Sequence, residues 1–165
     1  MAIYKIKSLD DLQKFAKNLC SKLKAGQIIA LTGELGAGKT TLVQMIAKEL
    51  GIKARVASPT FNLVKEYDVK PEVRGIKKLC HIDLYRIDGK FDDLGLDEYF
   101  DDKDSVLFIE WAEKIKKHLP KDVIWIKIDI KKDGTRAIEN KIILWLLALA
   151  EAGALPFLFL FLRQQ

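Results

Sequence analysis

The feature that most constrains this chain is the glycine-rich segment at residues 33–40, Gly-Glu-Leu-Gly-Ala-Gly-Lys-Thr, which fits the pattern GxxxxGK[ST]. An apolar run at residues 27–31 precedes it, and an amphipathic run at residues 41–50 follows it. A buried strand, a glycine loop and a helix in this order are typical of a phosphate-binding loop. Glycine tolerates positive φ, so successive N–H groups and the helix N-terminus can converge on anionic oxygens. The segment therefore predicts an α/β protein that binds a nucleoside triphosphate.

The loop residues also predict how the triphosphate would be held. Lys39 would reach the β- and γ-phosphates as a point charge, and the Thr40 hydroxyl would be one ligand of an octahedral Mg²⁺. A glycine-rich helix start that binds nothing is the alternative, and the complete motif in its strand and helix setting argues against it. The expected nucleotide contacts within the loop are Gly33, Glu34, Leu35, Gly36, Ala37, Gly38, Lys39, Thr40 and Thr41.

Composition and charge limit the number of domains and the classes of partner only broadly. The chain has 165 residues, 49% of them hydrophobic, which is enough for one domain with its own core. The net charge of +5 is spread along the chain, so it permits contact with RNA without indicating it. Cys20 and Cys80 lack CxxC spacing, which disfavours structural zinc and indicates reduced thiols. Residues 1–7 contain no apolar signal-peptide region, so we expect a cytoplasmic location.

Hydrophobic periodicity predicts alternating strands and helices over residues 1–141, which form the expected domain. The predicted fold is α/β and P-loop NTPase-like, with three layers, a mostly parallel central sheet and a C-terminal antiparallel hairpin. Asp133-Gly134 predicts a two-residue hairpin turn, and the alternation before it suggests an edge strand. Helices are expected at 8–24, 39–50, 91–100 and from 111, extended segments at 27–31, 52–57, 61–67, 79–86, 106–110, 123–130 and 136–141, and a loop at 70–78.

Two of the predicted strands carry acidic residues where apolar ones would be expected. Residues 106–109 are all apolar and are followed by Glu110, which suits a carboxylate that emerges beside Mg²⁺ at the ligand edge of a parallel sheet. In residues 79–86, alternation places Cys80, Ile82 and Leu84 on one face and His81, Asp83 and Tyr85 on the other. A hydrated edge would explain the polar row. Because Asp is a poor strand former, however, Asp83 also suggests a chemical role.

Two further segments have two readings each. Ser58-Pro59-Thr60 is either a simple bend or a switch in which Ser58 or Thr60 presents a hydroxyl to the γ-phosphate or its metal. From the residues alone, the bend is favoured. Trp111 is either a core residue at a helix start or a ring beside the nucleotide.

The end of the chain is anomalous, because Glu151 is the only charged residue between Ile142 and Leu162. At about −0.3 to −0.6 kcal/mol for each large apolar residue against about +2.5 to +3.5 for one central acid, membrane insertion is energetically conceivable. Pro156 and Glu151 interrupt the span, and a tail docked in the core or in a partner's groove explains the apolarity equally well. We therefore treat residues 142–165 as an apolar extension of open role.

Four motifs stand in order: GELGAGKTT (33–41), SPTF (58–61), HIDLYR (81–86) and IEWAEK (109–114). Together they resemble the TsaE family, also called YjeE, small bacterial ATPases of tRNA threonylcarbamoyladenosine (t6A) biosynthesis. The resemblance covers about residues 8–141. It implies ATP and Mg²⁺ as cofactors, and TsaD and TsaB as partners that modify adenosine 37 of tRNAs reading codons that start with A. Contact with tRNA would be indirect, through that complex.

The resemblance also implies residue roles. Lys39 would be catalytic and bind the phosphates, Thr40 and Glu110 would hold the metal, and Asp83 would be essential for hydrolysis. Ser58 and Thr60 would belong to a switch, and Trp111 would lie by the nucleotide. Intrinsic hydrolysis is expected to be slow and partner-activated, since neither the glycine loop nor residues 58–61 contain an arginine. Arg55 and Arg86 are the nearest candidates in the sequence.

Two other functions compete with a partner-activated ATPase. A small-molecule kinase would need an arginine-rich lid and an acceptor pocket, whereas the region after the loop is short and strand-like. A membrane-tethered nucleotide-binding module would use the C-terminal tail without turnover. A GTPase is disfavoured, because no Asn-Lys-x-Asp element is present.

Overall fold

The computed structural model describes residues 2–87 and 94–140, so the apolar tail predicted at 142–165 lies outside the described residues. None of the helices in the described ranges has the length and apolarity that a transmembrane span requires. In chain order the elements are β1 (Ala2–Ile6), α1 (Leu9–Cys20), β2 (Ile28–Thr32), α2 (Lys39–Glu49), β3 (Val64–Val73), β4 (Ile76–Asp83), α3 (Asp97–Asp101), β5 (Ser105–Glu110), the 3₁₀ helix η2 (Ala112–Ile115), β6 (Ile124–Ile130) and β7 (Arg136–Asn140).

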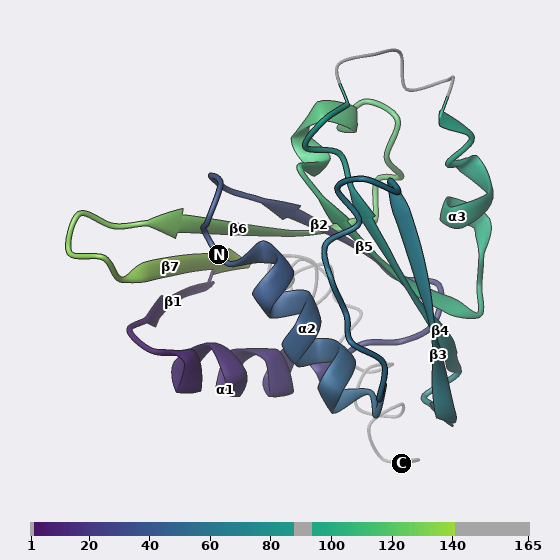
Figure 1. The fold of residues 1–165 in the computed structure, drawn as a ribbon, viewed down its shortest axis with the longest axis horizontal. Coiled ribbons are helices and arrows are strands. Elements are labelled where there is room, and N and C mark those ends of the chain that lie inside the picture. Colours follow the sequence, from purple (N-terminus) through teal and green to yellow (C-terminus); the bar gives the residue numbers. More distant parts are fainter. Residues whose placement is uncertain (1, 88–93, 141–165) are drawn as a thin grey trace, which may run out of the picture.

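The strands form one sheet in the order β1-β7-β6-β2-β5-β4-β3 (Figure 1). The four central strands β6, β2, β5 and β4 are parallel, while β3 and the β7-β1 pair run antiparallel at the two sides. This confirms the predicted α/β fold with a mostly parallel centre and a C-terminal antiparallel hairpin. Parallel strands place their carboxyl ends at one edge, where ligands bind in such sheets.

Alternation along β2 shows why the fold has three layers. Ile29 and Leu31 pack into the core under α1 and α2, whereas Ile28 and Ala30 pack into a second core with residues of α3 and η2. Both faces of the central strand are therefore buried, as its unbroken apolar run predicts. The helix α1 begins as expected, because the Ser8 side chain accepts a hydrogen bond from the Asp11 N–H.

Several predicted boundaries were wrong. The segment 70–78 is not a loop, because β3 continues to Val73 and β4 starts at Ile76, with Arg74 and Gly75 at positive φ in the tight turn between them. Pro71 is tolerated inside β3 because β3 is an edge strand with one unpaired side. The first strand, β1, was missed altogether. Its place at the sheet edge depends on pairing with β7, 130 to 138 residues later in the chain.

The other corrections concern how segments are placed. Residues 52–57 do not form a strand, and β3 begins at Val64 rather than at residue 61. The strand β6 is not an edge strand, since it lies between β2 and β7. Its hairpin turn contains three residues, 132–134, because the Lys131 N–H donates to Thr135 O and Gly134 takes positive φ. The helix after residue 111 is a single 3₁₀ turn. Of the helix predicted at 91–100, residues 91–93 lie outside the described residues, and in the described part the α-helix spans Asp97–Asp101.

Candidate nucleotide-binding site

A cavity of about 280 Å³ opens where the glycine loop meets the carboxyl ends of β4 and β5. The start of α2 and residues 58–60 close its other sides. Most of the residues that the sequence places at the site line this one cavity. The lining residues are Leu35, Gly36, Gly38, Lys39, Thr40, Thr41, Ser58, Thr60, Asp83, Tyr85, Glu110 and Trp111.

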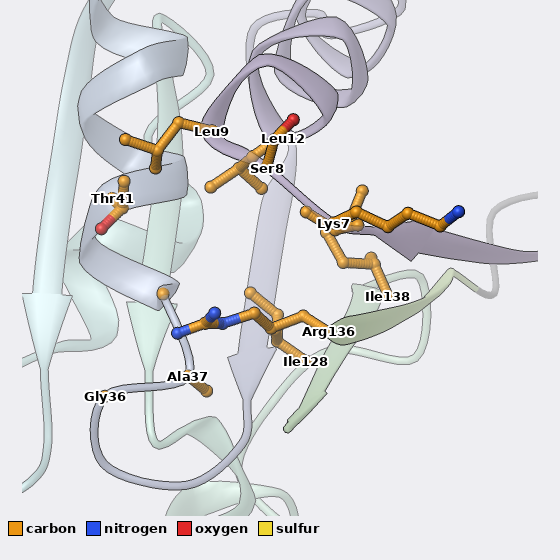
Figure 2. Close-up of a pocket in the computed structure, with 12 residues that line it drawn as sticks. Lys7, Ser8, Leu9, Leu12, Gly36, Ala37, Thr41, Ile128, Arg136 and Ile138 are labelled. Atoms are coloured by element: carbon orange, nitrogen blue, oxygen red, sulfur yellow. The ribbon is translucent and has the colours of Figure 1, made fainter. Parts of the chain in front are cut away.

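Three predicted loop residues do not line this cavity. Gly33 and Glu34 instead hold the lysine, since their carbonyl oxygens accept hydrogen bonds from Lys39 Nζ at 2.6 and 3.0 Å. Ala37 lines a neighbouring cavity on the other side of the loop (Figure 2). The glycines take the predicted left-handed conformations, with φ of 137° at Gly33 and 78° at Gly36.

Lys39 is buried, and its ammonium lies 4.1 Å above the centre of the Trp111 ring. Burial lowers the pKa of Lys39, and the negative charge of Glu110 opposes that shift. Trp111 itself has φ of 60°, a conformation unfavourable for a bulky residue, and it ends β5 abruptly so that its ring turns over the loop. The structure therefore places Trp111 in the cavity rather than in the core alone.

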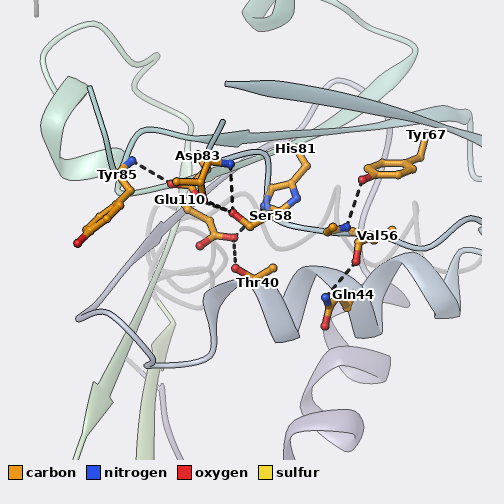
Figure 3. A network of polar contacts seen from close by, with 11 residues as sticks. Thr40, Gln44, Val56, Ser58, Tyr67, His81, Asp83, Tyr85 and Glu110 are labelled. Atoms are coloured by element: carbon orange, nitrogen blue, oxygen red, sulfur yellow. Dashed lines mark hydrogen bonds and ion pairs between the residues drawn. The ribbon is translucent and has the colours of Figure 1, made fainter. Parts of the chain in front are cut away.

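Glu110 lies at the centre of a group of hydrogen-bonded polar side chains at the carboxyl end of β5. Its Oε1 accepts a hydrogen bond from Thr40 Oγ1 at 2.7 Å and lies 2.9 Å from His81 Nε2 (Figure 3). Both Glu110 and His81 are buried. The carboxylate is thus oriented from two sides before any ligand arrives. The hydrated edge suggested for the polar face of β4 is wrong, because β4 is an interior strand between β3 and β5, and its residues His81 and Asp83 are buried.

Asp83 stands beside Glu110, since the two residues are register partners at the ends of the parallel strands β4 and β5. Its Oδ2 accepts hydrogen bonds from Ser58 Oγ at 2.6 Å and Thr60 Oγ1 at 2.7 Å. Its Oδ1 accepts from the Tyr85 N–H at 2.9 Å. The Ser-Pro-Thr segment is therefore more than a bend, because both of its hydroxyls bind an acidic residue of the site.

Val56 and Ala57, which precede the Ser-Pro-Thr segment, are held by hydrogen bonds although they do not belong to a strand. Gln44 Nε2, on α2, donates to Val56 O at 3.0 Å, and the Ala57 N–H donates to the Tyr67 hydroxyl of β3 at 3.4 Å (Figure 3). These contacts hold the entry to the 58–61 segment between α2 and β3. Beyond them, the exposed ring of Phe61 lies 4.2 Å from the Arg86 guanidinium. Arg86 is thus placed on the outside of the segment, and Arg55 is also exposed.

Comparison with known proteins shows the family of the chain. The sequence profile of the family described as "Threonylcarbamoyl adenosine biosynthesis protein TsaE" matches residues 6–138. The chain belongs to the TsaE family.

Relatives within the TsaE family align over most of the chain. The protein named tRNA threonylcarbamoyladenosine biosynthesis protein TsaE in Bacillus subtilis (strain 168) is 40% identical over 129 residues, 78% of each chain. The Aquifex aeolicus (strain VF5) protein of the same name is 38% identical over 135 residues, 81% of this chain and 90% of that protein. The crystal structure of Bacillus subtilis YdiB superimposes with a TM-score of 0.70 at 33% identity, covering 84% of this chain and 83% of that chain.

His81 is a residue of this site that the sequence analysis of this TsaE-family chain did not predict. The signal was available, because a histidine in an apolar strand two residues before Asp83 must share the face of that acid. The alternation of side chains along β4 does not show which strand lies next to β4 in the sheet. Only the parallel pairing of β4 with β5 brings His81 to Glu110.

Proposed function

We propose that this chain is a Mg²⁺-dependent ATPase that acts with TsaD and TsaB in forming t6A at adenosine 37 of tRNA. The observation that carries the proposal is the convergence of Thr40, Glu110 and Asp83 on one cavity beside the glycine loop. The names of the relatives supply the pathway. A small-molecule kinase fits less well, because no arginine lines the cavity within residues 2–87 and 94–140.

The donor set suits magnesium. Thr40 Oγ1 and Glu110 Oε1 lie 2.7 Å apart at the start of α2, and hydroxyl and carboxylate oxygens are the ligands that Mg²⁺ prefers. Thr40 would bind the ion directly, and Glu110 would bind it or order its waters. The ion would neutralise charge that develops on the phosphate oxygens. Lys39 would add a second positive charge beside the phosphates, because the carbonyl oxygens of Gly33 and Glu34 hold its ammonium against the glycine loop.

Asp83 is the candidate for positioning or deprotonating the attacking water. It is buried next to Glu110, yet it still lines the cavity, so its carboxylate faces the space that the γ-phosphate would enter. Phosphoryl transfer depends on positioning and electrostatics more than on covalent chemistry, so a well-oriented carboxylate is enough.

The same contacts suggest why hydrolysis by the isolated protein should be slow. The hydroxyls of Ser58 and Thr60 both donate to Asp83 Oδ2, so this oxygen already accepts two hydrogen bonds before a water could approach it. Releasing Asp83 requires these hydroxyls to turn or the 58–61 segment to move. A partner that moves this segment would expose the carboxylate, and Arg86 beside Phe61 lies where such a partner would meet it.

The experiment compares Asp83→Asn with the parent protein for ATP affinity by calorimetry and for phosphate release with purified TsaD and TsaB. We expect affinity within a few-fold of the parent and turnover reduced by about 10²-fold or more, as for loss of a general base. Asp122→Asn is the matched control, because Asp122 is an exposed acid that does not line the cavity. Parent-like turnover by Asp83→Asn would show that another group positions the water. A parent protein that binds no ATP would end the proposal.

A further inference from the structure

His81 is completely buried in β4, yet only one of its two ring nitrogens has a hydrogen-bond partner. Nε2 lies 2.9 Å from Glu110 Oε1, whereas Nδ1 is buried and meets no partner within residues 2–87 and 94–140. Two neighbours of the ring on this face of the sheet, Leu79 and Phe108, belong to the apolar core under α1 and α2. An apolar side chain would fill the position without leaving a buried nitrogen unpaired, so the contact with Glu110 is what histidine adds here.

The contact has a definite direction. An ionised carboxylate only accepts hydrogen bonds, so Nε2 carries a hydrogen and donates it to Glu110 Oε1. The donor comes from β4, and the acceptor is the last residue of β5, the strand paired with β4. Since the backbones of these two strands are held together by their ladder, the ring cannot easily move away from the carboxylate.

Both hydrogen bonds to Glu110 end on the same carboxylate oxygen. Thr40 Oγ1 donates to Oε1 at 2.7 Å from the start of α2, and His81 reaches Oε1 from β4 (Figure 3). In the described part of the chain no hydrogen bond is made to Oε2. The lone pairs of the Thr40 hydroxyl stay available for an ion while its hydrogen is donated. The carboxylate is therefore held at one oxygen, and the other is left for an ion or its waters.

We propose that His81 is a positioning residue for the magnesium site: its Nε2–H holds Glu110 so that Oε2 meets Mg²⁺ or a water bound to it. The inference rests on the proposed function, which supplies the ion and the triphosphate. A single hydrogen bond from Thr40 would leave the carboxylate free to rotate about that contact, whereas donors from α2 and β4 together fix its plane. Hydrogen-bonded partners behind a metal ligand typically change metal affinity or activity by about 10- to 100-fold.

The test separates magnesium-dependent from magnesium-independent nucleotide binding. A non-hydrolysable ATP analogue is titrated into the full-length protein by calorimetry, once with Mg²⁺ and once with EDTA. The ratio of the two dissociation constants gives the gain in affinity due to Mg²⁺. His81→Leu removes the donor and suits the apolar surroundings, so it should cut this gain by about tenfold or more and leave the affinity in EDTA unchanged.

Two amide variants test the donated hydrogen itself. His81→Gln places an N–H close to the position of Nε2, so it should keep most of the gain due to Mg²⁺. His81→Asn is one methylene shorter, cannot reach Glu110 Oε1, and should lose the gain as His81→Leu does. Both variants bury the same amide group, so a simple loss of packing would affect them alike. Their comparison decides the question even where His81→Leu does not fold.

Cys80→Ala is the matched control, since Cys80 is buried next to His81 in β4 but packs into the core on the opposite face of the sheet. It should keep the gain of the parent. A His81→Leu variant that keeps the gain, or Gln and Asn variants that lose it equally, would overturn the inference and leave the proposed function intact. A parent protein that binds the analogue equally well in Mg²⁺ and in EDTA would instead defeat the magnesium dependence of the proposed function.

Discussion

One added methyl group at Gly33 should destabilise the protein more than the same change at Gly36. A Cβ atom built on Gly33 lies 2.3 Å from the carbonyl oxygen of Ile128, whereas real Cβ atoms essentially never approach closer than 3.0 Å. Ile128 belongs to β6, where it pairs with Ile138 of β7 and directly follows Lys127, the last residue that pairs with β2. The carbonyl therefore cannot move away without disturbing two ladders.

The magnitude follows from two contributions. Positive φ in a residue with a side chain costs about 1–3 kcal/mol, and φ is 137° at Gly33 and 78° at Gly36. Overpacking adds about 1–3 kcal/mol, and it applies to Gly33 alone, because no atom lies within 4 Å of a Cβ built on Gly36. We therefore expect Gly33→Ala to reduce the free energy of unfolding by about 2–6 kcal/mol. Gly36→Ala should cost about 1–3 kcal/mol.

The assay is urea denaturation followed by tryptophan fluorescence, with the full-length parent and the two variants measured together. The difference between the variants, about 1–3 kcal/mol from overpacking, should appear as a lower midpoint for Gly33→Ala with an unchanged slope. Melting temperatures should differ in the same order, by about 2–4 °C per kcal/mol. Equal midpoints for the two variants would refute the reasoning, since they would show that β6 yields to the methyl group without cost.

Three other expectations follow from the site and the core. Burial raises the pKa of the Cys80 thiol to about 11, so this cysteine should resist iodoacetamide at about pH 8 in the native protein and react after denaturation. Rapid native labelling would contradict its burial. Arg86→Ala should leave ATP affinity unchanged and lower the partner-stimulated rate of phosphate release, because Arg86 lies on exposed Phe61, where we expect the partner to bind. An unchanged stimulated rate would show that Arg86 takes no part in activation by the partner. Deleting residues 142–165 should leave ATP affinity within a few-fold, and loss of the folded circular dichroism signal would show that the tail completes the core.

The positions of several site residues were predictable from the sequence because these residues lie in short stretches. The glycine loop, Lys39 and Thr40 are consecutive, and the strand and helix around them show in the hydrophobic pattern. Glu110 was found because it ends an apolar run. In each case a strand, a loop or a helix start determines where the side chain points, and none of these depends on a distant part of the chain.

The contacts between the motifs required the tertiary structure. Alternation shows which residues of β4 share a face, but the sheet order determines that β5 is its neighbour and that Asp83 stands opposite Glu110. The same pairing brings His81 to Glu110, and folding of the 58–61 segment brings Ser58 to Asp83.

The missed strand β1 and the misjudged position of β6 have the same cause. A short strand at a sheet edge has little pattern of its own, and its place depends on a partner far away in the chain. Hydrophobic pattern determines which side chains are buried. Which strands become neighbours is decided by the packing of the whole sheet, and that packing brings the acids and the hydroxyls of this site into contact.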